Sequence, residues 1–334
     1  MIKVFEGKSA DEVWRMAAAE LRHGSDARRQ DGRGGSTQEL LHAVFTIQDP
    51  RQRWVVARQP ALNPAFAIAE VVWILCGRRD SAFLNYWNSQ LPKYAGSGKE
   101  YHGAYGFRLR HQFGIDQLER ACQALRHNPD GRQVVLQIWD PRADFPDTHG
   151  RPLNADIPCS INSLLKIRDG KLEWMQIIRS NDLFRGVPYN FIQFTSMQEV
   201  LAGWLGVEIG SYNQLSDSLH LYDGDVELLG IGASDSAERN SDSLGLPKEE
   251  SNAVLTNVNH LIESMTAPGL LQEDLRALLA EHSIPGAFQN LLLVVAAEAA
   301  RKRGWLALAQ SLMNDCSNPA LIQAWKNWFI RLQQ

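Results

Sequence analysis

The chain has 334 residues, 44% of them hydrophobic, and a formal net charge of −4 at pH 7. This length is enough for a large hydrophobic core in one domain or two. The small net charge argues against a surface that coats nucleic acid, so any anion-binding arginines have to act locally. No stretch has the length and apolarity of a membrane span, and the N-terminus shows no signal peptide.

The cysteines give a first indication of the cellular compartment. The four of them are far apart and form no CxxC pair: Cys76, Cys122, Cys159 and Cys316. This pattern predicts free thiols in a reducing compartment, without a disulfide framework or a zinc site. We therefore expect a cytoplasmic protein without a bound metal.

The first part of the chain predicts a mixture of helices and strands. Residues 9–12 fit a capping box at the start of a helix. Residues 26–35 are rich in arginine and glycine, which predicts a mobile basic loop, and residues 40–47 predict a strand. Residues 66–75 are strongly apolar and contain one acid, Glu70.

The next elements have clearer local signals. Residues 133–139 form a β-branched run between turn residues, and residues 161–178 predict a hairpin that turns at Asp169-Gly170. Residues 191–205 have helical spacing, and a strand is predicted near residues 208–215.

Beyond residue 230 the pattern changes. Residues 231–252 are polar and predict an exposed loop or linker, whereas residues 253–334 are helical in pattern throughout. In the last helix, Asn318 is the expected cap and Pro319 the first residue. We expect an α+β catalytic domain over residues 1–230 and a helical C-terminal region packed on it or on a partner subunit.

Two short segments contain the most informative residues. Residues 156–160 read Asp-Ile-Pro-Cys-Ser, and residues 178–190 include Arg179, Ser180 and Asn190. An isolated cysteine is most often structural, but the predicted hairpin places Arg179 across from Cys159, and a nearby cation favours the reactive thiolate. Arginine and serine suit a phosphate, and an amide can read the edge of a heterocycle. The combination predicts covalent chemistry on a phosphorylated base.

A cysteine hydrolase that uses Cys159 and His220 is an alternative. It leaves the Arg179–Ser180 pair unexplained, and no acid that could orient His220 follows at a recognisable spacing.

Several motifs together resemble thymidylate synthase and its nucleotide-hydroxymethylase relatives. They are Glu70-x-x-Trp73, Tyr105-Gly106, Asn128-Pro-Asp-Gly-Arg132, Pro158-Cys159, Arg179-Ser180-x-Asp182, Gly186-x-Pro188-x-Asn190 and His220-Leu-Tyr222. The resemblance runs from near residue 30 to about residue 225, roughly three fifths of the chain. It implies a thymidylate-synthase-like mixed sheet packed with helices.

The resemblance also implies a reaction. Cys159 would add to C6 of a pyrimidine nucleoside 5′-monophosphate, and C5 would then attack the one-carbon unit of 5,10-methylenetetrahydrofolate. Glu70 would act as general acid and base through ordered water, with Tyr105 as a further catalytic residue. An acid within an apolar run requires such a role unless it lies on an exposed helix face, which is the alternative for Glu70.

The implied phosphate site consists of Arg179, Ser180 and arginines from elsewhere. Arg132 matches a clamp that reaches in from the neighbouring subunit, which implies an obligate homodimer with shared active sites. Arg33, in the glycine-rich segment, is either a mobile fourth arginine or a solvated loop charge.

The remaining implied contacts concern base, sugar and folate. Asn190 would read the base and favours uracil, because relatives that act on cytosine nucleotides place an aspartate there. A lone histidine is by default a core residue, but the His-x-Tyr spacing puts His220 and Tyr222 on one strand face, where they would bind the sugar hydroxyl. The residues expected to contact folate are Asp182, Gly186 and Trp87. Neither a membrane nor a nucleic acid is an expected partner.

The chain departs from the common pattern of the family. Ser160 replaces a histidine, Ile178 replaces a glutamine, and Gln133 replaces the second of two adjacent arginines. A helical block replaces the strand-rich C-terminus that closes over folate. A synthase has to shield its intermediate from water, whereas a hydroxymethylase has to let water in. Altered lids and water networks are where that difference is expected to arise.

We therefore favour a specialised nucleotide 5-hydroxymethylase acting on UMP, dUMP, CMP or dCMP. An ordinary thymidylate synthase that methylates dUMP is the first alternative. A catalytically inactive nucleotide-binding regulator, with the helical region as a docking module, is the alternative from another class. The sequence leaves ribose and deoxyribose open.

Overall fold

The computed structural model describes residues 2–32, 34–229, 236–280 and 284–332. Arg33 and the first part of the predicted linker therefore lie outside the described residues. Among the helices of these ranges, none combines the length and the apolarity needed to cross a membrane.

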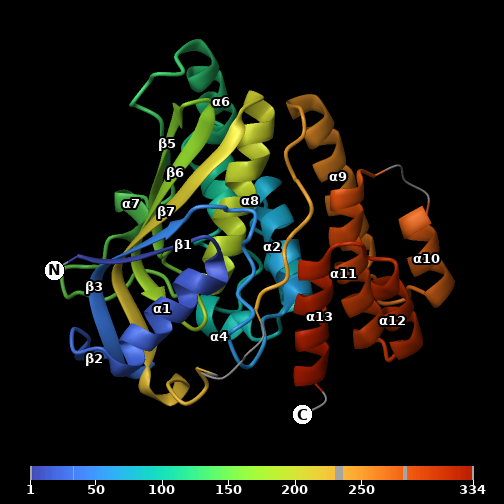
Figure 1. Cartoon of the computed structure of the whole chain (residues 1–334), viewed down its shortest axis with the longest axis horizontal. Helices are drawn as coiled ribbons and strands as arrows, with labels where there is room; N and C mark the ends of the chain where they lie inside the picture. The colour runs from blue at the N-terminus through green and yellow to red at the C-terminus, as the bar shows by residue number, and fades with distance from the viewer. Residues whose placement is uncertain (1, 33, 230–235, 281–283, 333–334) are drawn as a thin grey trace.

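A mixed seven-stranded sheet forms one side of the molecule (Figure 1). The strand order is β1-β3-β7-β6-β5-β4, and β2 pairs with β3. The pairs β1–β3 and β6–β7 are parallel and the others antiparallel. The strands are β1 (Lys3–Gly7), β2 (Arg28–Gly32), β3 (Gly35–Ile47), β4 (Val135–Gln137), β5 (Ser160–Arg168), β6 (Lys171–Asp182) and β7 (Glu208–Tyr222). The predicted α+β class is confirmed.

Helices cover one face of this sheet and make up the whole C-terminal part that the structure describes (Figure 1). Those before residue 230 are α1 (Ala10–His23), α2 (Pro64–Leu75), α3 (Ser81–Trp87), α4 (Leu91–Ala95), α5 (Tyr105–Phe107), the π-helix η1 (Arg108–Gln112), α6 (Gln117–His127), α7 (Pro141–Asp144), α8 (Val187–Leu205) and the 3₁₀ turn η2 (Asp223–Asp225). The later ones are α9 (Lys248–Ser264), α10 (Gln272–Ala280), α11 (Gly286–Lys302), α12 (Leu306–Asn314) and α13 (Pro319–Arg331).

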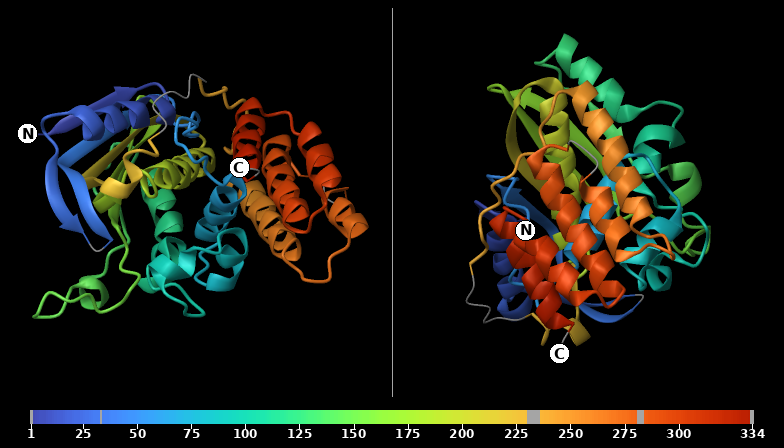
Figure 2. Two further views of the ribbon diagram at one scale, coloured as in Figure 1. Left: turned by 90° about the horizontal axis from the view of Figure 1, so that it is seen from below. Right: turned by 90° about the vertical axis from the view of Figure 1, so that its right-hand side faces the viewer.

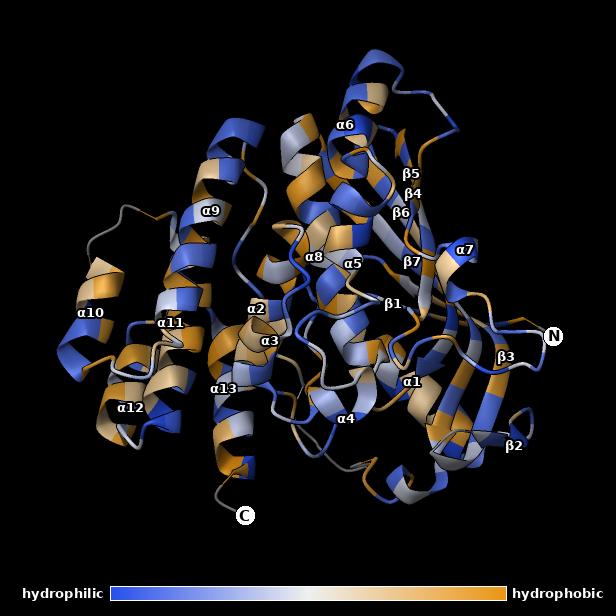
Figure 3. Cartoon of the chain, turned by 180° about the vertical axis from the view of Figure 1, so that it is seen from behind, coloured by the Kyte–Doolittle hydropathy of each residue, from blue (hydrophilic) through white to orange (hydrophobic). Residues whose placement is uncertain are grey.

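Helices α2 and α8 form a central layer between the sheet and the C-terminal helices (Figures 1 and 2). Almost every residue of both helices is buried, as expected of helices that are apolar around most of their circumference. Helix α8 packs on β6 and β7, while α2 contacts α8 on one side and α9, α11 and α13 on the other. Figure 3 shows hydrophobic segments on α2 and α8 and hydrophilic outer turns on α9.

Local signals in the sequence correctly predicted several boundaries. The hairpin of β5 and β6 turns at Asp169 and Gly170, both with positive φ, as a two-residue turn requires. The Asn318 side chain accepts from the amides of Ala320 and Leu321 at the start of α13. At α1, Ser9 caps the Glu12 amide, but Glu12 bonds back to the amide of Lys8 instead of Ser9.

Other predictions need correction. Residues 26–35 were expected to be a mobile loop, but Arg28–Gly32 is a strand because its backbone pairs with β3, and the Arg29 side chain bonds to Ser36 and Asp223. The strand predicted over residues 133–139 is only Val135–Gln137. The amides of Ile138 and Trp139 both donate to the carbonyl of Ile161, which ends the regular ladder.

Two boundaries moved as well. The strand β7 continues to Tyr222, well beyond the predicted residue 215, because it pairs with β3 and β6 along its length. Helix α9 begins at Lys248, so the end of the predicted polar linker is helical.

Candidate active site

The nucleophile candidate lies at the start of the β5–β6 hairpin. Cys159 is exposed and directly precedes β5, and its carbonyl accepts from the amide of Arg179 at 2.9 Å. The Arg179 guanidinium also donates to the carbonyls of Pro158, from Nε at 3.0 Å, and Ile157, from Nη2 at 3.1 Å. One arginine therefore fixes the loop that presents the thiol. Its Nη1 has no hydrogen-bond partner among the described residues, which leaves donors for an anion.

Tyr105 lies beside this loop. Burial raises the pKa of the Tyr105 phenol, and the nearby Cys159, Asp156 and Glu70 raise it further. The hydroxyl is therefore a neutral donor. Its ring stacks on Phe194 of α8, with 6.0 Å between centroids. The three predicted catalytic residues, Cys159, Glu70 and Tyr105, are thus gathered in one region.

Ser160, the residue in place of the usual histidine, is fully buried beside Tyr105. The Ser160 and Tyr105 hydroxyls are close enough to interact, and this contact opposes the rise in the pKa of Tyr105, but their geometry is poor and Ser160 Oγ has no well-formed hydrogen bond to a described residue. Because buried hydroxyls almost always have a partner, this atom is expected to bind a ligand or an ordered water in the working enzyme.

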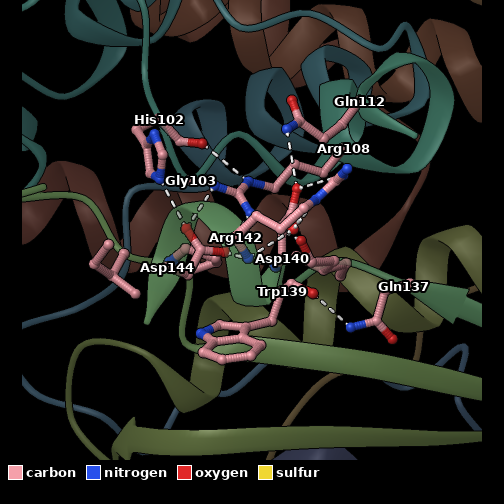
Figure 4. A network of polar contacts seen from close by, with 12 residues as sticks. His102, Gly103, Arg108, Gln112, Gln137, Trp139, Asp140, Arg142 and Asp144 are labelled. Atoms are coloured by element: carbon pink, nitrogen blue, oxygen red, sulfur yellow. Dashed lines mark hydrogen bonds and ion pairs between the residues drawn. The ribbon is translucent and has the colours of Figure 1, made fainter. Parts of the chain in front are cut away.

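A buried polar network anchors the segment that leads into Tyr105 (Figure 4). Asp144 accepts from Arg108 Nη2 at 2.9 Å, and its Oδ1 lies 2.7 Å from His102 Nε2. Burial opposes ionisation of Asp144, but the bonds from Arg108 and its neighbours outweigh it and lower the pKa of this carboxyl. Asp156 accepts from the Gly103 amide at 2.7 Å, and burial raises its pKa.

This network joins residues 102–108 to the loop before Cys159, and the sequence reasoning missed it. The sequence shows Arg108 but not its burial. Once the structure shows that Arg108 is 2% exposed, a carboxylate partner is expected. The spacing of the partners along the chain, 36 residues for Arg108 and Asp144, gives no local pattern.

Glu70 faces α8. Its Oε2 accepts from Nε2 of Gln193 at 2.6 Å, and Oε1 of Gln193 accepts from Nδ2 of Asn190 at 3.2 Å. Burial raises the pKa of Glu70 to about 7, although the bond from Gln193 opposes the shift. A carboxyl that titrates near neutrality suits proton transfer. The alternative of an exposed helix acid is wrong, because the side chain is only partly exposed and bonds to a buried amide.

Gln193 was not among the predicted site residues. It lies three residues after Asn190 on α8, so both side chains share one helix face. That spacing was the available signal.

The sugar-binding candidates lie at the end of β7. The rings of His220 and Tyr222 meet edge to face with 5.6 Å between centroids, so the two side chains share a strand face as the spacing predicted. Ser180 and Asp182 on β6 pair with Ser218 and His220 in the sheet.

The turn after β6 contains two folate candidates. Asp182 Oδ1 accepts from the amides of Phe184 and Arg185, at 2.8 and 2.9 Å, and Oδ2 from Arg185 Nη1 at 3.1 Å. A Cβ on Gly186 would lie 2.8 Å from Asn181 Oδ1 and 3.2 Å from the Asp182 carbonyl oxygen, so a larger residue would have to displace the buried Asn181 side chain. The carboxylate of Asp182 therefore shapes this turn already.

The last candidates are dispersed. Trp87 is 2% exposed and packs against Tyr86, so in this structure its ring offers little surface to a ligand. Arg132 is exposed and makes no hydrogen bond or ion pair with the rest of the described chain. Arg33 lies outside the described residues. No set of three metal-ligating side chains comes together in the part of the chain that the structure describes.

Comparison with known proteins gives a consistent result. A family model described as thymidylate synthase matches residues 16–258. Two phage proteins named deoxyuridylate hydroxymethyltransferase are 35% identical: that of Bacillus phage SP01 over 201 residues, 57% of this chain and 51% of the phage protein, and that of Pseudomonas phage M6 over 198 residues, 58% and 55%. A putative thymidylate synthase of Methanothermobacter thermautotrophicus is 28% identical over 221 residues, 63% of this chain and 89% of the archaeal protein. The chain spans about half the length of the phage relatives.

Proposed function

Because this chain belongs to the thymidylate synthase family, we propose that it transfers a one-carbon unit to C5 of a pyrimidine nucleoside 5′-monophosphate. The supporting observation is the arrangement of Cys159, which is exposed on a loop that Arg179 holds by two carbonyls. Cys159 and Glu70 both lie close enough to Tyr105 to raise its pKa, which supports a shared site.

In the proposed reaction the Cys159 thiolate adds to C6 of the base, and C5 gains the electron density to form a bond with carbon. The donor, 5,10-methylenetetrahydrofolate, supplies a one-carbon unit at the oxidation level of formaldehyde. In hydroxymethylation C5 then loses its proton, tetrahydrofolate leaves, water adds to the new carbon, and the C6–S bond breaks to release the Cys159 thiolate and the product. Arg179 and Ser180 bind the 5′-phosphate, since a guanidinium matches phosphate oxygens. Glu70, with a pKa of about 7, gives and takes protons near the base, and Asn190 binds its polar edge.

His220 and Tyr222 bind the sugar hydroxyl, and Asp182 and Gly186 contribute to the folate site in this proposal. Asp182 could do so without leaving the turn, because each carboxylate oxygen has more than one lone pair.

We favour 5-hydroxymethylation of dUMP over methylation. The phage relatives at 35% identity are named for that reaction, whereas a thymidylate synthase of Clostridium beijerinckii is 25% identical. The buried Ser160 hydroxyl, which has no well-formed hydrogen bond to a described residue, supports the same choice, since it is suited to hold a water next to the reacting base. Methylation of dUMP is the second candidate, and a nucleotide-binding regulator without turnover the third.

The deciding experiment incubates the protein with 5,10-methylenetetrahydrofolate and, separately, UMP, dUMP, CMP and dCMP. Mass spectrometry of the nucleotide distinguishes a gain of CH₂O, which we expect with dUMP, from a gain of CH₂. The second result would replace hydroxymethylation by methylation. Nucleotide binding without any product would favour the regulator.

We also propose a cytoplasmic homodimer in which Arg132 binds the phosphate in the partner's site. The exposure of Arg132 and its lack of a hydrogen bond or ion pair with any described residue support this, and none of the four cysteines, all within the described ranges, forms a disulfide. Mixing and refolding Cys159→Ala with Arg132→Glu tests the shared site. A hybrid dimer would regain one working site, whereas a self-contained subunit would stay inactive in every combination.

A further inference from the structure

The bridge between Glu70 and Asn190 connects two functions that lie on different helices. Gln193 donates to Glu70 across the α2–α8 interface and accepts from Asn190 on its own helix. Gln193 and Asn190 are 5% and 8% exposed, so bulk water competes little for these bonds. A carboxylate and the base-binding amide are thereby joined through one side chain.

The bridge has a polarity. An ionised carboxylate only accepts hydrogen bonds, so Gln193 must turn its NH₂ to Glu70 and its carbonyl to Asn190. Asn190 must then give one N–H to Gln193, which leaves its Oδ1 and its second N–H for a ligand. This orientation follows from the donor and acceptor inventory once Glu70 is charged.

The remaining groups of Asn190 match one base. Uracil offers a donor at N3 and an acceptor at O4, which pair with the Oδ1 and the second N–H. Cytosine offers an acceptor at N3 and a donor at C4, so Asn190 would have to reverse. Its oxygen would then face the oxygen of Gln193, unless Gln193 also reversed and faced Glu70 with an acceptor.

We propose that Gln193 is a positioning residue that determines base selectivity: it transmits the acceptor character of Glu70 to Asn190 and thereby favours uracil over cytosine. The inference rests on the proposed function, because it concerns the same nucleotide site. It assigns to one buried glutamine a specificity that would otherwise be attributed to Asn190 alone.

The polarity applies to the ionised form of Glu70, which predominates above its pKa of about 7. The titratable side chains that its charge affects are Tyr105 from α5 and Tyr189 from α8, and burial raises the pKa of both phenols, so both are neutral. No lysine or arginine of the described residues forms an ion pair with Glu70, and within the described chain Gln193 is the side chain that donates a hydrogen bond to it.

The test compares Gln193→Met with Gln198→Met. Methionine has a similar length without hydrogen-bonding capacity, and Gln198 is a buried glutamine of the same helix that bonds to the carbonyls of Leu172 and Gly210 instead. Tritium release from 5-tritiated dUMP and dCMP gives kcat/KM for each. We expect Gln193→Met to lower the dUMP-to-dCMP ratio on the order of tenfold, the effect of one buried hydrogen bond.

Gln198→Met should lower stability and leave the ratio unchanged. A ratio in Gln193→Met equal to the wild-type ratio would overturn the proposal, because a purely structural role lowers both rates alike.

Gln193→Glu separates the two ends of the bridge. A carboxylate still accepts from Asn190, so the uracil preference should persist. Loss of the donor to Glu70 and the proximity of two carboxylates should move the acid limb of the rate profile to higher pH. A loss of selectivity as large as that of Gln193→Met would contradict the mechanism.

The wild-type protein tests the proposed function separately from the role of Gln193. If it releases no tritium from either nucleotide, the reaction is wrong, and calorimetric affinities for dUMP and dCMP then test selectivity. The same loss of preference in Gln193→Met would support the inference, and an unchanged preference, or no binding of either nucleotide, would overturn it.

Discussion

The active-site region around α2, α8 and the β5–β6 hairpin differs from the surface where the C-terminal helices dock in how particular buried polar groups are bonded. In the active-site region, Ser160 Oγ and Asn162 Oδ1 have no well-formed hydrogen bond to a described residue, and burial raises the pKa of Glu70 to about 7. Where the C-terminal region meets the body, Asn290 and Asn318 both donate to Asp242, at 2.9 and 2.7 Å. At these positions polar capacity is open beside the proposed nucleotide site and bonded internally at the docking surface, while Ser251 Oγ of α9 and Trp325 Nε1 of α13 also lack a partner among the described residues.

The largest expected effect comes from exchanging cysteines in the two regions. Cys159→Ala should reduce tritium release from 5-tritiated dUMP by on the order of 10³-fold or more, because it removes the nucleophile. Cys316→Ala, a buried residue of the C-terminal region, should lower the free energy of unfolding without affecting turnover. Undiminished release in Cys159→Ala would refute covalent catalysis.

Glu70→Gln should show how the raised pKa of Glu70 makes the free energy of unfolding depend on pH. The pKa of Glu70 is about 7 in the folded protein and near 4.5 when unfolded. The folded state therefore holds a proton that the unfolded state has lost. Wild-type stability from this group is full below pH 4.5, falls as the pH rises to about 7 and is constant above it, a change of roughly 3 kcal/mol at most.

Glutamine cannot ionise but still accepts from Gln193, so Glu70→Gln should abolish this pH dependence and exceed the wild type in stability at pH 8. Urea unfolding between pH 4.5 and 8 measures it. If the free energies of unfolding of the two proteins changed with pH in the same way, burial would not raise the pKa of Glu70.

Asp242→Ala probes the docking surface. It leaves the amide donors of Asn290 and Asn318 without their carboxylate and should cost about 2 kcal/mol of unfolding free energy. Asp315→Ala removes an exposed acid from the same region and should stay within about 0.5 kcal/mol of the wild type. Equal effects of the two substitutions would mean that the Asp242 contacts do not hold the region in place.

The smallest effect is expected of Ser160→Ala. Removing a buried hydroxyl that lies beside Tyr105 without a well-formed hydrogen bond should stabilise the free protein by at most about 1 kcal/mol while lowering kcat. Urea unfolding and steady-state rates measured together test this. A destabilised variant would indicate that Ser160 has a structural partner, and the contrast between the two regions would weaken.

The sequence correctly predicted those structural features that depend on residues close together in the chain. The turn at Asp169-Gly170 and the cap Asn318 were correct because each depends on residues within a few positions. The segment 26–35 was wrong because its charged residues become a strand only by pairing with β3.

The site shows the same limit. Motifs identified Cys159, Glu70 and Asn190, and the structure brings Glu70 and Asn190 together through one bridging residue. That residue, Gln193, lies 123 positions from Glu70, and the partners His102 and Asp144 are 42 apart. Hydrogen-bond networks across such separations have no periodicity or spacing that a single sequence reveals.

The position of α2 has a consequence for any attempt to shorten the protein. This helix is apolar around its circumference and is covered on one side by α8 and on the other by α9, α11 and α13. A fragment that ends before Lys248 would present the second side to water as a continuous hydrophobic strip. Such fragments should self-associate or be degraded when expressed alone. The C-terminal helices therefore cover part of the hydrophobic core. Natural substitutions in α2 are expected to be accompanied by substitutions in the C-terminal helices that contact it.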